Sequence, residues 1–166
     1  PTVKLRLGNL FDGPADLIVV PCSTSGTVTG FVAHSLSQYS IPHPREGMNL
    51  GEVDIVPFEG ADDIAQFVAF AASVLRNKSS AEAVEAIGRA VGTFTTKEPS
   101  VRSVSAPLVG TGAGGLSGEV AAAALRRGFF DTAAPDATLV IHVLHPDIYD
   151  RLRSNRPIIQ GRAKKS

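Results

Sequence analysis

Two runs made up largely of apolar residues constrain the fold of this chain more than any other feature of its sequence. They are LIVVP at residues 17–21 and TLVIHVL at residues 138–144. Neither run alternates polar with apolar residues, so each predicts a strand that is buried on both faces. A strand of this kind needs a layer of helices on each side of its sheet, which is the arrangement of α/β proteins.

The rest of the chain alternates between strand and helix patterns. Further strands are predicted at residues 2–7, 53–58 and 103–107, while residues 67–72 fit either a strand or a helix extension. Helices are predicted at residues 31–39, 81–91, 118–130 and 146–152, and Thr29, Ser80 and Ser117 can cap the first three. We therefore predict a three-layer α/β/α fold around a mixed, mostly parallel sheet. Residues 1–157 would form this domain, and residues 158–166 a flexible C-terminal tail.

The balance of charges and the single cysteine limit which binding partners and which cellular compartment the chain suits. The 166 residues carry 16 basic and 16 acidic side chains, so no general attraction to nucleic acid or to an acidic membrane is expected. No apolar stretch approaches the ~18 residues that would span a bilayer. The single cysteine excludes an internal disulfide and suits a reducing compartment. We expect a cytoplasmic location, without a nucleic-acid partner or membrane contact from this segment.

The stretch PLVGTGAGGLSGE, residues 107–119, joins a predicted strand to a predicted helix. Its first nine residues contain four glycines and no charge. Glycine permits a positive φ, and successive amides in such a loop can converge on an anion beside the following helix N-terminus. The loop therefore predicts phosphate binding by the main chain, and the alternative is a tight turn with close packing. A Ser/Thr/Gly loop at residues 22–30 also follows a strand, and ligands of parallel sheets bind at these carboxyl ends.

The spacing of Gly110, Gly112 and Gly115 also matches the dinucleotide fingerprint G-x-G-x-x-G. That fingerprint follows the first strand of its unit and is completed by an acidic residue at the end of the next strand. Here only one convincing strand follows, and no acidic residue ends it. The loop contains no lysine, which excludes a P-loop.

Four stretches together resemble the macro domains, a family of α/β modules that bind ADP-ribose. SVSAPLVGTGAGGLSGEVAAAAL at residues 103–125 resembles the second phosphate-binding loop of that family. LGNLFDGPADLIVVPCS at residues 7–23 is similar to its opening, and SGTVTGFVAHSL at residues 25–36 lies where it has its first glycine-rich loop. TLVIHVLHPDIYDRL at residues 138–152 resembles its last strand and helix. The resemblance implies a macro-type fold that binds ADP-ribose or a related nucleotide derivative, with ADP-ribosylated protein as a further candidate partner.

The resemblance also implies three groups of ligand-binding residues. One side of the diphosphate and the second ribose would be wrapped by Gly110, Thr111, Gly112, Ala113, Gly114 and Gly115. The other side of the diphosphate would be closed by Gly26, Thr27 and Val28. The adenine site would comprise Asn9, where the family usually has an aspartate, with Leu10 and Val20 lining the pocket and His145 or Pro146 beside the ring.

Two departures favour binding over turnover. Family members that hydrolyse ADP-ribose linkages usually carry an asparagine-rich N-A-A-N segment, and those positions here are Val20, Pro21, Cys22 and Ser23. The first loop has one glycine where the family has a run, and the β-branched residues that follow it stiffen the backbone. We therefore assign no catalytic residue, metal or cofactor. Two alternatives remain: an ADP-ribosyl hydrolase that works by substrate-assisted water attack, and a ligand-sensing regulatory domain fused to an effector.

Other reactive or aromatic residues have simpler interpretations. Cys22 could act as a nucleophile, but the residues predict a small buried side chain lining a pocket. His142 and His145 are three apart on or beside a strand, which points them to opposite faces and argues against a shared metal. Phe129 and Phe130, at the end of a helix, are both expected in the core.

Overall fold

The computed structural model describes residues 1–12, 14–58 and 64–161 of the chain. Within them lie six strands: β1 (Thr2–Leu7), β2 (Leu17–Ser23), β3 (Val53–Pro57), β4 (Phe67–Val74), β5 (Ser103–Pro107) and β6 (Thr138–Val143). The helices are α1 (Gly30–Gln38), α2 (Ala81–Lys97), α3 (Gly118–Thr132) and α4 (Pro146–Gly161), with a short 3-10 turn, η1 (Gly112–Gly114). The ambiguous segment at residues 67–72 is a strand. Helix α4 continues through residues 158–161, which were expected in the tail, and residues 162–166 lie outside the described part.

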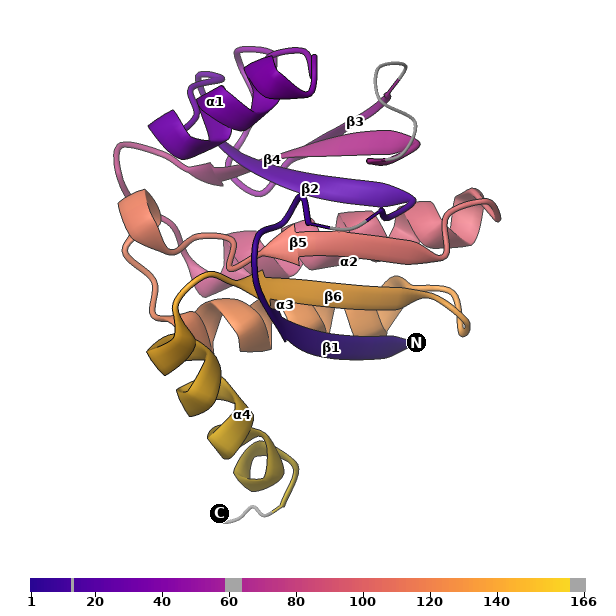
Figure 1. The fold of residues 1–166 in the computed structure, drawn as a ribbon, viewed down its shortest axis with the longest axis vertical. Coiled ribbons are helices and arrows are strands. Elements are labelled where there is room, and N and C mark those ends of the chain that lie inside the picture. The colour runs from indigo at the N-terminus through magenta and orange to yellow at the C-terminus, as the bar shows by residue number, and fades with distance from the viewer. Residues whose placement is uncertain (13, 59–63, 162–166) are drawn as a thin grey trace.

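The strands form one sheet in the order β1-β6-β5-β2-β4-β3. Every neighbouring pair is parallel except β3 and β4, which are antiparallel. This is the mixed, mostly parallel α/β sheet that the sequence predicts. The carboxyl ends of the parallel strands therefore lie at one edge, on the left in Figure 1.

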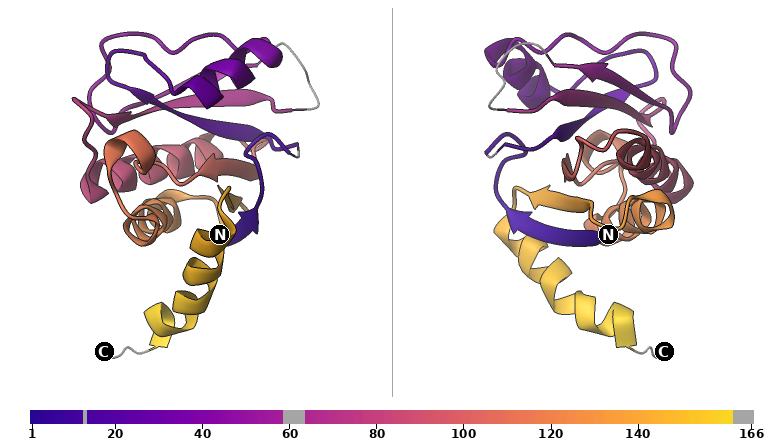
Figure 2. Two further views of the ribbon diagram at one scale, coloured as in Figure 1. Left: turned by 60° about the vertical axis from the view of Figure 1, so that its left-hand side comes forward. Right: turned by 90° about the vertical axis from the view of Figure 1, so that its right-hand side faces the viewer.

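Helices on both faces explain why β2 is apolar throughout. Leu17 and Val19 belong to the core cluster that includes α2 and α3, whereas Ile18 and Val20 belong to the cluster that includes α1. In Figure 1, α2 and α3 lie behind the sheet, and the two turned views of Figure 2 show α1 against the opposite side. Helix α4 leaves the sheet near the ends of β1 and β6 and projects away from the rest of the fold. No described helix combines the length and apolar composition that a membrane crossing requires.

The predicted helix caps are present. The side chains of Thr29, Ser80 and Ser117 each accept a hydrogen bond from the backbone N–H three residues later, at the start of α1, α2 and α3. Each such cap satisfies one of the amides that a helix N-terminus leaves without a partner. The local sequence thus fixes where each of these helices begins.

Helices α2 and α3 contact each other through their backbones. A Cβ atom built on Gly128 would lie 2.0 Å from the carbonyl oxygen of Glu85. One built on Gly88 would lie 2.4 Å from the carbonyl oxygen of Leu125, and one on Gly92 would lie 3.0 Å from the carbonyl oxygen of Phe129. Only glycine allows this approach, so these three residues set the distance between the two helices.

Asp16 ties the start of β2 to the start of β5. Its carboxylate accepts hydrogen bonds from the backbone N–H groups of Arg102 and Ser103, at 2.8 and 3.0 Å, and from the side-chain amide of Gln66. Partial burial raises the pKa of this carboxyl, but the hydrogen bonds from Arg102 and Ser103 outweigh it and the net pKa is lowered. The ionised carboxylate therefore stabilises the amino-terminal junction of these strands.

Candidate ligand site at the carboxyl edge of the sheet

The sheet opens between β2 and β5. These strands pair only at Leu17 with Val104 and at Ile18 with Ser105. Strand β2 then continues to Ser23, so the carboxyl ends of the two strands are not hydrogen-bonded to each other. Both predicted ligand loops leave the sheet on either side of this opening, as Figure 1 shows.

The second loop adopts the backbone conformation that its glycines predict. Gly110, Gly112 and Gly115 have φ values of 88°, 63° and 76°. A Cβ on Gly110 would lie 2.9 Å from Ser79 Oγ, whereas Cβ atoms on Gly112 and Gly115 would meet nothing within 4 Å. The loop therefore packs on Ser79 with one side and leaves Gly112 and Gly115 facing open space.

Two adjacent amides of this loop remain available to a ligand. The N–H groups of Gly114, Gly115 and Leu116 donate to carbonyl oxygens within the loop. Those of Gly112 and Ala113 donate to no acceptor among the residues that the structure describes. Successive N–H groups in a turn with alternating backbone sign form a concave donor site for an anion oxygen. The loop can thus hold a phosphate without a cationic side chain.

The first loop is closed upon itself by hydroxyl groups. Ser23 Oγ lies 2.6 Å from Thr27 Oγ1 and 3.0 Å from Ser25 Oγ, and it accepts a hydrogen bond from the Thr27 N–H. Gly26, at φ 84°, backs onto the carbonyl oxygen of Arg45, which a Cβ would approach to 2.9 Å. The side chain of Val28 packs against the core cluster beneath α1. This loop is therefore stiffer than a run of glycines would be.

The segment between β4 and α2 brings the two loops together. The Thr24 N–H donates to the Val74 carbonyl at 3.0 Å, and the Ser79 N–H donates to the Gly114 carbonyl at 3.0 Å. Only a tight turn at residues 75–78 separates Val74 from Ser79, with backbone hydrogen bonds in both directions between Leu75 and Lys78. Residues 26–28 and 110–115 are therefore anchored to one short segment at the same edge of the sheet.

Two of the residues assigned to adenine, Asn9 and His145, lie just past the ends of β1 and β6, which are neighbours. The Gly8 N–H donates to the Val143 carbonyl at 2.9 Å, so Asn9 directly follows the end of the ladder. Asn9 Oδ1 accepts a hydrogen bond from the Phe11 N–H at 3.0 Å, which leaves one lone pair for a ligand. His145 is exposed immediately before α4.

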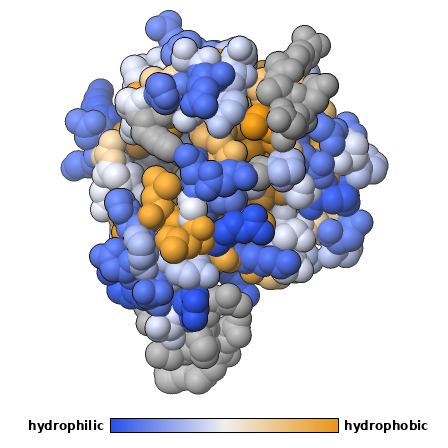
Figure 3. Space-filling view, viewed as in Figure 1, coloured by the Kyte–Doolittle hydropathy of each residue, from blue (hydrophilic) through white to orange (hydrophobic). Residues whose placement is uncertain are grey.

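An exposed apolar surface beside Asn9 was missed by the sequence reasoning. Leu144 was predicted in a buried strand, but it is 56% exposed, and Leu7 on the neighbouring strand is 45% exposed. Figure 3 shows an orange, apolar patch left of centre on this face of the molecule. Leu7 ends β1, and Leu144 directly follows the paired strand β6. The sequence contained one signal for this exposure, because Leu144 is the last residue of its apolar run. Its side chain offers an apolar surface to a base.

Leu10 and Val20 do not reach this surface. Leu10 is buried, and Val20 is 0% exposed within the core cluster beneath α1. Both can support the wall of an adenine pocket from behind. Direct contact of either side chain with a base stays a prediction.

Two titratable groups near this edge, Cys22 and His142, have pKa values shifted in favour of their neutral forms. Burial, followed by repulsion from Asp54, raises the pKa of the Cys22 thiol to about 12, so it is not a nucleophile at neutral pH. Burial, and then Arg6, lower the pKa of His142, with a smaller opposing effect from Asp12. His142 Nε2 lies 3.2 Å from Ser105 Oγ. In the described part of the chain, no group of three or more His, Cys, Asp or Glu residues is placed to hold a metal ion.

Comparisons with known proteins identify similar folds. Neither the family models nor the curated proteins that were compared with this sequence gave a match. Among solved structures, the macrodomain of Mycobacterium tuberculosis DarG superposes with a TM-score of 0.68 at 16% identity, covering 85% of this chain and 97% of that chain. The Oceanobacillus iheyensis macrodomain with ADP gives 0.77 at 15% identity, covering 94% and 90%. Alphavirus P23pro-zbd gives 0.75 at 18% identity, covering 97% of this chain and 24% of that one. At these identities the likeness establishes a shared fold.

Proposed function

We propose that this chain, whose fold is that of the macrodomains, binds ADP-ribose or a related nucleotide derivative and acts as a reader or sensor of it. Solved structures of similar fold include one with ADP and one with ADP-ribose. The observation that carries the proposal is the second loop, in which the adjacent amides of Gly112 and Ala113 donate to no described acceptor and Gly112 faces open space. Two adjacent donors on an exposed glycine loop suit an oxygen acceptor such as a phosphate.

In this proposal the diphosphate lies between the two loops. Its oxygens accept from the Gly112 and Ala113 amides, and hydrogen bonds to a charged partner contribute about 1.5–3 kcal/mol each. Adenine lies at the ends of β1 and β6, where Asn9 Oδ1 accepts from the exocyclic amine and Leu144 packs against the ring. The second ribose then extends toward the segment between β4 and α2, because the ligand crosses the sheet from β6 to β2.

We propose binding without hydrolysis. Of the four residues in place of the asparagine-rich segment, Val20 and Cys22 are buried and the Cys22 thiol is protonated. The Ser23 hydroxyl already contacts Ser25 and Thr27. None of these groups is therefore suited to activate a water molecule at the second ribose.

Calorimetric titration with ADP-ribose, and with AMP as a fragment, tests the proposal. We expect ADP-ribose to bind more tightly than AMP, because AMP lacks the second phosphate and ribose. Gly112→Glu should abolish binding, since its carboxylate would occupy and repel the phosphate site. Gly51→Glu is the matched control: Gly51 also has a positive φ, 91°, its Cβ would make an ordinary contact at 3.4 Å, and its N–H bonds the Ala72 carbonyl of β4 and neither loop.

Three outcomes would contradict the proposal. They are no heat from ADP-ribose at millimolar concentration, an unchanged affinity in Gly112→Glu, and an equal loss of affinity in both glycine variants. Incubation with ADP-ribosylated protein should release no ADP-ribose, and catalytic release would replace the reader with the hydrolase.

A further inference from the structure

Strand β1 is an open edge of the sheet. It pairs with β6 along its whole length, and in the described sheet no strand lies on its other side. The outward main-chain N–H and C=O groups of such a strand are available to another strand wherever α4, which packs beside the end of β1, does not cover them. Lys4 and Arg6 project from one face of β1, are exposed, and form no ion pair with any described residue.

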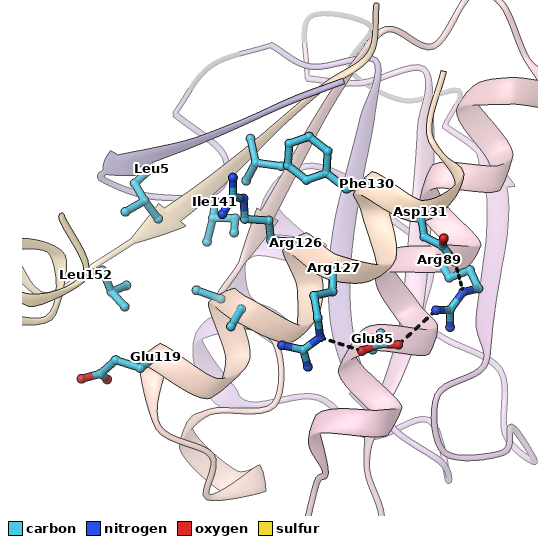
Figure 4. A pocket seen from close by; sticks show the side chains of 13 residues that line it. Leu5, Glu85, Arg89, Glu119, Arg126, Arg127, Phe130, Asp131, Ile141 and Leu152 are labelled. Atoms are coloured by element: carbon cyan, nitrogen blue, oxygen red, sulfur yellow. Dashed lines mark hydrogen bonds and ion pairs between the residues drawn. The ribbon is translucent and has the colours of Figure 1, made fainter. Parts of the chain in front are cut away.

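The other face of β1 borders an apolar groove. This β1–α3 groove encloses about 690 Å³. Its apolar floor is formed by Val3, Leu5, Ala122, Ile141 and Leu152. Figure 4 shows Leu5 and Ile141 on the strands opposite the side chains of α3, with Leu152 of α4 at one end. The groove is distinct from the carboxyl edge of the sheet, because Val3 and Leu5 lie before the end of β1.

One flank of α3 forms the wall of the groove. Ala122, Arg126 and Phe130 are spaced four apart, so they share one side of the helix. Phe130, expected in the core, is 41% exposed, and Arg126 lies 5.0 Å from the centre of its ring. Arg127, on the side facing α2, pairs with Glu85, whereas Arg126 pairs with no carboxylate in the described residues. The wall thus offers an apolar ring and one cation without an acidic partner. The acidic residues that also line the groove, Glu85, Glu119 and Asp131, are each paired with an arginine.

We propose that an extended segment of another protein adds to the free edge of β1 as a seventh strand, and that this segment alternates apolar and acidic residues. Its main chain would pair with β1, which spans six residues or about 20 Å. Its apolar side chains, on alternate positions, would enter the β1–α3 groove and cover Leu5 and Phe130. Its acidic side chains would lie on the opposite face, beside Lys4 and Arg6.

Charge decides against a second copy of this chain as the occupant. Pairing two β1 edges would place Lys4 and Arg6 of one copy near the same cations of the other. Like charges in such cross-strand positions destabilise the pair, whereas opposite charges stabilise it. The same cations that oppose self-association therefore favour an acidic strand.

A fluorescein-labelled synthetic peptide of eight residues, alternating valine and glutamate, tests this inference by fluorescence anisotropy at low salt. We expect saturable binding of the alternating peptide. A control peptide of the same composition, with its valines in one block and its glutamates in another, measures the effect of charge alone. The double variant Lys4→Glu/Arg6→Glu should raise the dissociation constant by about tenfold or more. The same variant should gain binding to a peptide alternating valine and lysine. Arg76→Glu/Lys97→Glu, an equal charge change at exposed sites elsewhere, should leave the dissociation constant unchanged.

Hydrogen exchange locates the peptide. Binding should slow exchange of the β1 amides that do not bond β6, and Phe130→Ser should weaken binding without a change of fold by circular dichroism. Equal binding of the alternating and block peptides would overturn the proposal. So would unchanged affinity in the charge-reversed variant, or a concentration-dependent dimer of the free chain by sedimentation. None of these results depends on whether ADP-ribose binds.

Discussion

Replacing Gly128 with alanine adds one methyl group where α2 and α3 touch. The new Cβ would lie 2.0 Å from the Glu85 carbonyl oxygen and 2.7 Å from the Arg89 nitrogen. Both are backbone atoms in the middle of α2, so neither can rotate away. Ordinary contact begins at 3.4 Å, so relief requires a local separation of about 1.4 Å between the helices.

Two opposing effects set the size of the change. Alanine is favoured over glycine inside a helix by about 1 kcal/mol. Overpacking of a well-packed contact costs about 1–3 kcal/mol, and contact with rigid backbone belongs at the upper end of that range. Gly128→Ala should therefore lower the free energy of unfolding by about 2 kcal/mol, and Tm by about 4–8 °C for a chain of this length.

Urea unfolding followed by circular dichroism measures this difference. Gly30→Ala is the control, since Gly30 is also a helical glycine, the first residue of α1, but a Cβ there meets nothing within 4 Å. We expect this variant to be unchanged or up to about 1 kcal/mol more stable. If Gly128→Ala is as stable as the parent protein, α2 and α3 are not in backbone contact and the reasoning fails.

Three further predictions use other groups. Asp16→Asn should lower the free energy of unfolding at pH 7. This loss should shrink below pH 3.8, the ordinary carboxyl pKa, and vanish as the pH falls through the lowered pKa of the folded protein. Equal losses at pH 7 and pH 2, measured by urea unfolding, would contradict the prediction. The pKa of Cys22 is raised from 9.0 to about 12, so the residue holds about a thousandfold less thiolate than an ordinary cysteine. Alkylation at pH 8 should therefore be at least a thousandfold slower in the native protein than in urea. Comparable rates would show that Cys22 is not buried. Asn9→Ala should weaken ADP-ribose binding by about 1 kcal/mol while Asn9→Asp retains it, as measured by calorimetry, and full affinity in the alanine variant would mean that adenine is held elsewhere.

The sequence was sufficient for most of the architecture because its strongest signals are local. The run at residues 17–21 had to be covered on both faces, and β2 is covered on both. The capping residues before α1, α2 and α3 act within one turn, so their effect does not depend on distant parts of the chain. The glycine loop is likewise a local signal, because its glycines predict positive φ angles and Gly110, Gly112 and Gly115 have them.

The errors concern residues whose environment is decided by elements distant in sequence. Phe130 was expected in the core, but it is 41% exposed and lines the β1–α3 groove. Leu144 continues an apolar run, but the sheet ends one residue earlier, at Val143. Helix periodicity placed Val84, Ile87 and Val91 on the buried face of α2, and all three are buried. Periodicity could not show that Gly88 and Gly92 contact another backbone, because that depends on the crossing of α3.

The glycines of this chain separate into two physical roles, and the space around each decides which one it has. At Gly88 and Gly128 a side chain would strike a carbonyl oxygen of the opposite helix, so glycine there serves packing. At Gly112 and Gly115 a side chain would meet nothing, although the positive φ still selects glycine. Packing cannot explain a residue with empty space beside it. The conformation at Gly112 instead exposes its amide and that of Ala113 without a protein acceptor. These exposed amides donate to water in the free protein, and the titration of the Gly112→Glu variant decides whether an anion takes the place of that water.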